Sequence, residues 1–65
     1  RSLAIAYDRA GDDGMAAVVT AERLLLQGAF GDARIQAQRA KRLLPPGSPG
    51  ALRADDVLAV RPPRR

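Results

Sequence analysis

The sequence predicts an all-α protein built from antiparallel helical hairpins, with about four short helices. Alanine and leucine dominate over β-branched residues, and no segment alternates polar and apolar residues with a period of two. Glycine and proline divide the chain into segments of helix length. With 65 residues and no cysteine, the chain allows one small core without a disulfide. We therefore expect one helical module over residues 1–60, followed by a basic, proline-containing tail over residues 61–65.

Two helices are expected in the first half of the chain. The first is predicted from Ser2 to Ala10, and to end in the polar segment Gly11–Gly14. The second is predicted from Met15 to Gln27, with Gly28 in left-handed geometry as its end. The acidic pair at positions 12 and 13 is expected to cap the second helix and complement its dipole. Apolar residues surround most of the second helix, so we expect it to be the central element.

The third helix is expected to begin at Phe30 or Gly31 and to end at Leu44. Pro45 and Pro46 follow, and proline both interrupts a helix and disfavours helical geometry in the residue before it. The apolar residues of this segment form one stripe, which predicts a helix with one buried face. The stripe consists of Ala33, Ala37, Ala40 and Leu44.

The fourth helix has the clearest beginning. Ser48 is expected as its N-cap and Pro49 in its first turn, where a missing N–H has little consequence. The helix is expected to end before Pro62. Asp55 and Asp56 are too far inside it to act as caps and are expected to be exposed to solvent.

A repeat of seventeen residues runs through the sequence. Gly11-x-x-Gly14-x-Ala16 recurs as Gly28-x-x-Gly31-x-Ala33, and the next break, Pro45, follows Gly28 by the same interval. Seventeen is half of the period of about 34 residues found in tetratricopeptide repeats, where it spans one helix and its turn. The positions that define the repeat are Ala4, Tyr7, Gly11, Ala21, Leu24, Gly28, Phe30, Ala33, Ala40 and Pro45.

These positions resemble the tetratricopeptide consensus, which implies a fragment of a right-handed solenoid. Ala21 matches the small residue of a first helix, and Gly28-Ala29-Phe30 matches the turn. Ala33 and Ala40 match the small contacts of a second helix, with Pro45 as terminator. The sequence departs from the consensus where aromatic residues are common, with Ala17, Leu24 and Ala37 in their place. A helical hairpin without repeats is therefore the alternative.

A second resemblance covers about Leu3 to Leu58. The segments Gly14-Met15-Ala16-Ala17, Leu44-Pro45-x-Gly47-Ser48-Pro49 and Leu52-Arg53-Ala54 are similar to the C-terminal repeat region of bacterial periplasmic zinc metalloproteases. The resemblance implies that this chain is part of a longer protein of the cell envelope whose HExxH protease domain precedes it. The chain has no histidine, so the resemblance assigns it no zinc ligand and no catalytic residue.

An apolar stripe on the second predicted helix is the candidate docking site. In the resembling fold, these positions line the concave groove. The alternative is that they are core, covered by the first and fourth helices, as apolar residues at helical spacing usually are. As a docking face, the stripe would accept an adjacent domain, a peptide or a second copy. It consists of Met15, Val18, Val19, Glu22, Leu25 and Leu26.

The charge of the chain is the basis of an alternative function. The net charge is +4, and Arg61, Arg64 and Arg65 in the tail supply most of it. Arg34, Gln38 and Arg42 form a basic face on the third helix, which is either simply solvated or binds a partner. The alternative function is thus a free-standing basic adaptor for nucleic acid or an acidic protein. Nucleic acid is the weaker of these, because stacking aromatic residues are scarce.

No enzymatic activity, cofactor or small-molecule ligand is expected. The sequence has neither histidine nor cysteine to act as base, nucleophile or soft metal ligand. The longest apolar runs are too short to span a bilayer. The function expected is a non-catalytic scaffold that binds a protein partner or an adjacent domain, and the compartment is periplasmic if the second resemblance holds.

Overall fold

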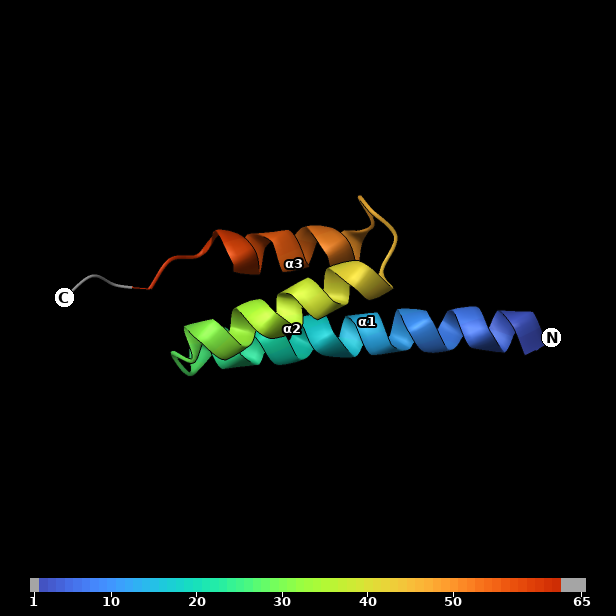
Figure 1. The fold of residues 1–65 in the computed structure, drawn as a ribbon, viewed down its shortest axis with the longest axis horizontal. Coiled ribbons are helices and arrows are strands. Elements are labelled where there is room, and N and C mark those ends of the chain that lie inside the picture. Colours follow the sequence, from blue (N-terminus) through green and yellow to red (C-terminus); the bar gives the residue numbers. More distant parts are fainter. Residues whose placement is uncertain (1, 63–65) are drawn as a thin grey trace.

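The computed structural model describes the backbone of residues 2–62 and the side chains of residues 11–62. Three helices follow one another, α1 (Ser2–Leu26), α2 (Phe30–Leu43) and α3 (Pro49–Ala59), and the described chain contains no strand. Helices α1 and α2 form an antiparallel hairpin, while α3 runs in the direction of α1 and packs against both (Figure 1). The prediction of an all-α protein of helical hairpins is confirmed.

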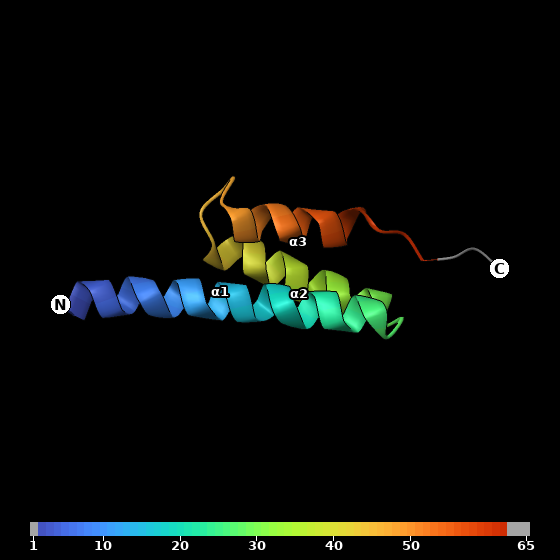
Figure 2. The same ribbon diagram turned by 180° about the vertical axis from the view of Figure 1, so that it is seen from behind.

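The prediction of a break at Gly11–Gly14 is wrong, because α1 continues through it without interruption. The described chain therefore has three helices where four were expected. A glycine inside a helix costs about 1 kcal/mol but does not by itself end it, and no proline stands in this segment. Asp12 and Asp13 consequently lie exposed within α1 and cap no helix. The N-terminal part of α1 extends beyond the ends of α2 and α3 (Figures 1 and 2).

The turn between α1 and α2 is closed by a left-handed glycine, as the sequence predicts. Gly28 has a φ of 82°. Its N–H donates to the carbonyl of Leu25 at 3.0 Å, and the N–H of Ala29 donates to the carbonyl of Leu24 at 2.9 Å. This pair of bonds is the Schellman motif, which satisfies the carbonyls at the end of α1 and reverses the chain into the hairpin.

The left-handed geometry makes Gly28 sensitive to substitution. We expect Gly28→Ala to lower the free energy of unfolding by about 1–2 kcal/mol, because a Cβ disfavours positive φ. Gly31→Ala is the matched control. Gly31 lies inside α2 with no described atom within 4 Å of an added Cβ, so alanine should stabilise the helix there. Urea titrations measure both, and equal shifts of the two midpoints would contradict the assignment.

The ends of α2 and the start of α3 follow the local sequence. Helix α2 begins at Phe30 and ends at Leu43, one residue before the expected end, with Leu44 extended ahead of Pro45. Helix α3 has Ser48 as its N-cap, whose Oγ accepts a hydrogen bond from the N–H of Ala51 at 3.3 Å. The predicted cap of the last helix is confirmed.

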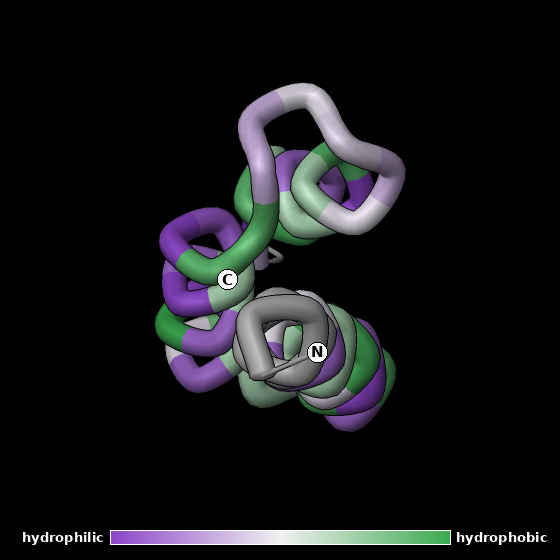
Figure 3. Tube along the Cα trace, turned by 90° about the vertical axis from the view of Figure 1, so that its right-hand side faces the viewer, coloured by the Kyte–Doolittle hydropathy of each residue, from purple (hydrophilic) through white to green (hydrophobic). Residues whose placement is uncertain are grey.

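The core is made mostly of small side chains. Seven of its ten buried apolar residues are alanines, and Val18 is the largest side chain that is fully buried. Seen end-on, the three helices stand at the corners of a triangle around this core (Figure 3). Small residues let helices approach closely. The buried apolar residues are Ala17, Val18, Ala21, Ala33, Ala37, Ala40, Leu44, Ala51, Ala54 and Val57.

Candidate functional site

The predicted docking stripe on α1 is divided between core and surface. Val18 is fully buried, and Met15 and Leu25 are partly buried against the core. Val19 and Leu26 are exposed, at 44% and 90% of their surface. Helices α2 and α3 both pack on α1, and together they cover only part of its circumference. The stripe is thus neither wholly core nor wholly surface.

Glu22, the polar member of the stripe, joins α1 to α3. Its carboxylate accepts two hydrogen bonds from Arg53, one from Nε at 3.0 Å and one from Nη2. The hydrogen bond to Glu22, and then the charge of that carboxylate, raise the pKa of Arg53 above its ordinary value. The pair is solvent-exposed, so its contribution to stability is small and falls with salt. The pair shows that the face of α1 carrying Glu22 is turned toward α3.

Val19 and Leu26 form what we call the apolar pair. They are seven residues apart and therefore lie on the same face of α1, on either side of Glu22 along the helix. Large apolar side chains are also exposed on α2, on α3 and just after α3, and sequence reasoning did not single these out. A signal for one of them was present, since Ile35 lies off the alanine stripe of α2. These further exposed residues are Ile35, Leu52 and Val60.

The predicted basic face lies on the solvent side of α2. Arg34, Gln38 and Arg42 are all exposed. Arg34 is nevertheless engaged, because its Nη1 donates to the backbone carbonyl of Leu58 at 2.8 Å, in the last turn of α3. A cation in this position complements the negative end of the helix dipole. Lys41, on the same helix, pairs with Asp55 of α3 at 2.6 Å.

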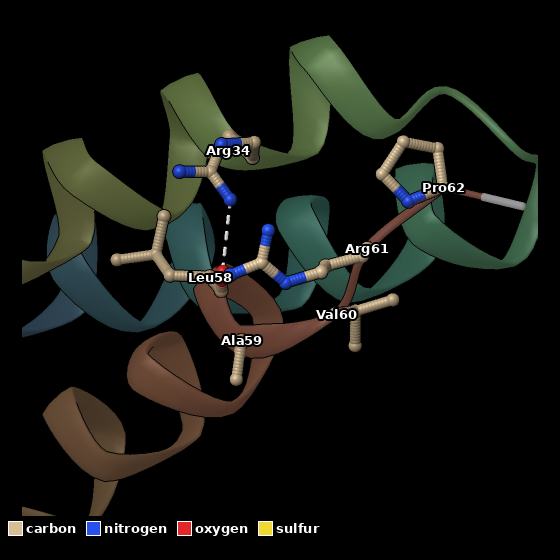
Figure 4. A pocket seen from close by; sticks show the side chains of 6 residues that line it. All are labelled: Arg34, Leu58, Ala59, Val60, Arg61 and Pro62. Atoms are coloured by element: carbon tan, nitrogen blue, oxygen red, sulfur yellow. Dashed lines mark hydrogen bonds between the residues drawn. The ribbon is translucent and has the colours of Figure 1, made fainter. Parts of the chain in front are cut away.

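A hollow of about 530 Å³ opens where α3 ends against α2. Arg34 reaches over it from α2 and Arg61 from the extended segment that follows α3, with both guanidinium groups directed toward the same space (Figure 4). Leu58, Ala59, Val60 and Pro62 complete its lining. Sequence reasoning assigned Arg61 to the tail and did not bring it together with Arg34.

The positions that define the sequence repeat have unequal structural roles. Gly11 is inside a helix, whereas Gly28 forms a turn, and the corresponding residues Ala16 and Ala33 are exposed and buried. The repeat therefore does not mark two equivalent turns. Of the remaining positions, Ala21 and Ala40 are buried, Leu24 and Phe30 partly buried, and Pro45 exposed; the side chains of Ala4 and Tyr7 lie outside the described residues.

The polar side chains of the described residues form no metal-binding cluster and leave no buried atom unpaired. Among residues 11–62 there is no group of three or more acidic, histidine or cysteine side chains that would hold a metal ion. No buried side-chain nitrogen or oxygen in this range lacks a hydrogen-bond partner. None of the helices, over the length that is described, has the run of apolar residues needed to cross a bilayer.

Comparisons with models of protein families, with curated proteins and with solved structures found no match to this chain.

Proposed function

We propose that this chain is a non-catalytic helical module that binds protein, and that its main partner is an adjacent domain of the same polypeptide. The observation that carries the proposal is the exposed apolar pair. Leu26 exposes 90% of its surface. The core, by contrast, consists largely of alanine side chains. An apolar side chain of this size gains free energy when a partner removes it from water, roughly 1.5–3 kcal/mol for a full burial.

The arrangement of the helices supports a module of the repeat type. Helix α3 lies against both members of the α1–α2 hairpin and runs in the direction of α1. The first helix of a following hairpin in a tetratricopeptide solenoid would be expected to pack in this manner, because each hairpin buries its face on the next. Leu52, on the solvent side of α3, would then contact the second helix of that hairpin.

The sequence resemblance suggests the parent. If the chain is the C-terminal repeat region of a periplasmic zinc metalloprotease, the catalytic HExxH helix stands earlier in the same polypeptide. The module described here then serves as the scaffold that positions the protease domain or its protein substrates. Absence of histidine and cysteine from the whole sequence agrees with a non-catalytic role for this part.

This proposal is tested with the domain encoded upstream in the same reading frame. We expect that domain to contain HExxH and to bind the chain in a calorimetric titration. The double variant Val19→Ser, Leu26→Ser should weaken the affinity at least tenfold. Leu52→Ser, which removes an exposed leucine from another helix, should leave the affinity unchanged.

The two parts of the proposal fail separately. An upstream frame without HExxH would remove the protease as parent while leaving the docking surface in place. Equal affinity of the wild-type chain and the double variant would show that the apolar pair does not contact the upstream domain.

A further inference from the structure

Charge is segregated among the helices. Helix α2 has four cations and one acid, a net charge of +3, whereas α1 has two cations and four acids and α3 has one cation and two acids. Two of the α2 cations already have an internal partner, Lys41 in an ion pair and Arg34 in a hydrogen bond. The end-on view shows the outer side of α2 as mainly hydrophilic (Figure 3). The basic surface is therefore local to α2.

Two cations converge at one end of this surface. The guanidinium groups of Arg34 and Arg61 face the hollow between α2 and the end of α3 (Figure 4). Neither has a carboxylate within 4.0 Å among the described residues. Arg34 uses one N–H on the carbonyl of Leu58, and a guanidinium has five N–H donors, so donors are left for a ligand. Like charges that face one space repel each other, and an anion between them removes that repulsion.

The rest of the lining decides what kind of anion fits. Leu58, Ala59, Val60 and Pro62 give the hollow an apolar side, which suits a carboxylate attached to an apolar segment better than a bare phosphate. Non-specific binding of single-stranded nucleic acid relies on aromatic stacking, and no aromatic residue lines the hollow. An acidic peptide matches both the charge and the apolar part.

The surface also sets a spacing. Arg34, Gln38 and Arg42 follow one another at intervals of four residues, so Arg42 lies about 12 Å along the helix from Arg34 and about 80° around its axis. In an extended peptide, residues four apart point to the same side and are separated by about 13 Å. Of two acidic residues at this spacing, one would lie between Arg34 and Arg61, and the other would lie beside Arg42.

We propose that the basic face of α2, together with Arg61, binds an extended acidic peptide segment that has two carboxylate side chains four positions apart and an apolar residue beside the first. This inference deepens the proposed function and rests on it, since both assign a protein-binding role to the chain. The surface is a different one, however, because the apolar pair lies on α1.

The probe is a synthetic capped peptide with two glutamates four positions apart and a leucine next to the first. Its matched control has glutamine in place of both glutamates. In a ¹⁵N-detected NMR titration we expect the glutamate peptide to shift amide signals of Arg34, Gln38, Arg42 and residues 58–62. The glutamine peptide should bind at least tenfold more weakly.

Three variants separate a specific site from general charge attraction. Arg61→Gln should lower the affinity for the glutamate peptide at least fivefold, and it leaves the bond from Arg34 to Leu58 in place, so α3 keeps its capping contact. Arg34→Gln, Arg61→Gln should lower the affinity further. The control Arg23→Gln, Arg39→Gln removes the same charge from α1 and from the side of α2 that borders α1, where Arg39 lines a different hollow with Asp13 and Thr20. This control should change the affinity less than twofold.

An equal loss of peptide affinity in the Arg34, Arg61 variant and in the Arg23, Arg39 control would overturn the proposal. Peptide-induced shifts of amide signals outside α2 and residues 58–62 would also overturn it. Tighter binding of a single-stranded oligonucleotide, with the same dependence on Arg61, would also overturn it. The variant Val19→Ser, Leu26→Ser should bind the peptide like the wild type. Loss of peptide binding alone would leave the proposed docking of the apolar pair unaffected.

Discussion

Replacing Gly14 with valine is expected to lower the free energy of unfolding by about 3 kcal/mol, at the upper end of what overpacking a core costs. Gly14 is buried where α1 meets the end of α2. A Cβ at this position would lie 2.6 Å from Cγ and 2.7 Å from Cδ2 of Leu44, and 3.3 Å from Cβ of Leu43. Leu44 is itself a core residue, so it has little room to move away.

Gly11 provides the matched control for this substitution. It lies three residues earlier in α1, and no described atom is within 4 Å of an added Cβ. Valine has a slightly better helix propensity than glycine, so Gly11→Val should change the free energy of unfolding by less than about 0.5 kcal/mol. Chemical denaturation followed by circular dichroism measures both. Similar losses at positions 11 and 14 would show that Gly14 is not a packing contact.

Val18→Asp is expected to unfold the chain. Val18 is completely buried in the core, and the core of the described residues contains no cation that could pair with a carboxylate there. An uncompensated buried charge destabilises by about 3–5 kcal/mol. That amount is comparable with the whole stability expected of a 65-residue domain, about 3–10 kcal/mol.

The neighbouring residue is the control, because Val19 is 44% exposed. Val19→Asp keeps the charge in water and should change the free energy of unfolding by no more than about 0.5 kcal/mol. Circular dichroism is therefore expected to show a helical spectrum for Val19→Asp and a largely disordered one for Val18→Asp. Two folded variants would contradict the assignment of Val18 to the core, and two unfolded ones would contradict the exposure of Val19.

Local signals in the sequence were sufficient for the helical class and for most helix ends. Ser48 with Pro49, Gly28 and Pro45 act within one turn of the chain, so their effects depend on adjacent residues only. The continuity of α1 through Gly14 was not predictable in this way. It is favoured by packing of Gly14 on Leu44, thirty positions later in the sequence, and local spacing does not reveal such a contact.

In the candidate site, too, features set by neighbouring residues were predictable, and features set by contacts between distant parts of the sequence were not. The alanine stripe of α2 was predicted because a helical period places its members on one face, and all of them are buried. Which residues of the α1 stripe are buried and which are exposed depends on where α3 lies. The contact between Glu22 of α1 and Arg53 of α3 joins residues 31 positions apart in the sequence. The meeting of Arg34 with Arg61 likewise depends on the path of the chain after α3.

The central claim is that the chain presents an apolar docking surface on α1, and sedimentation equilibrium tests it most directly. Alone in solution, the chain has only a second copy of itself to cover Val19 and Leu26. We therefore expect reversible self-association of the wild type at high micromolar concentration. The variant Val19→Ser, Leu26→Ser should be monomeric, with the same helical spectrum. A wild type that stays monomeric over the whole concentration range, or a double variant that associates equally well, would contradict the claim.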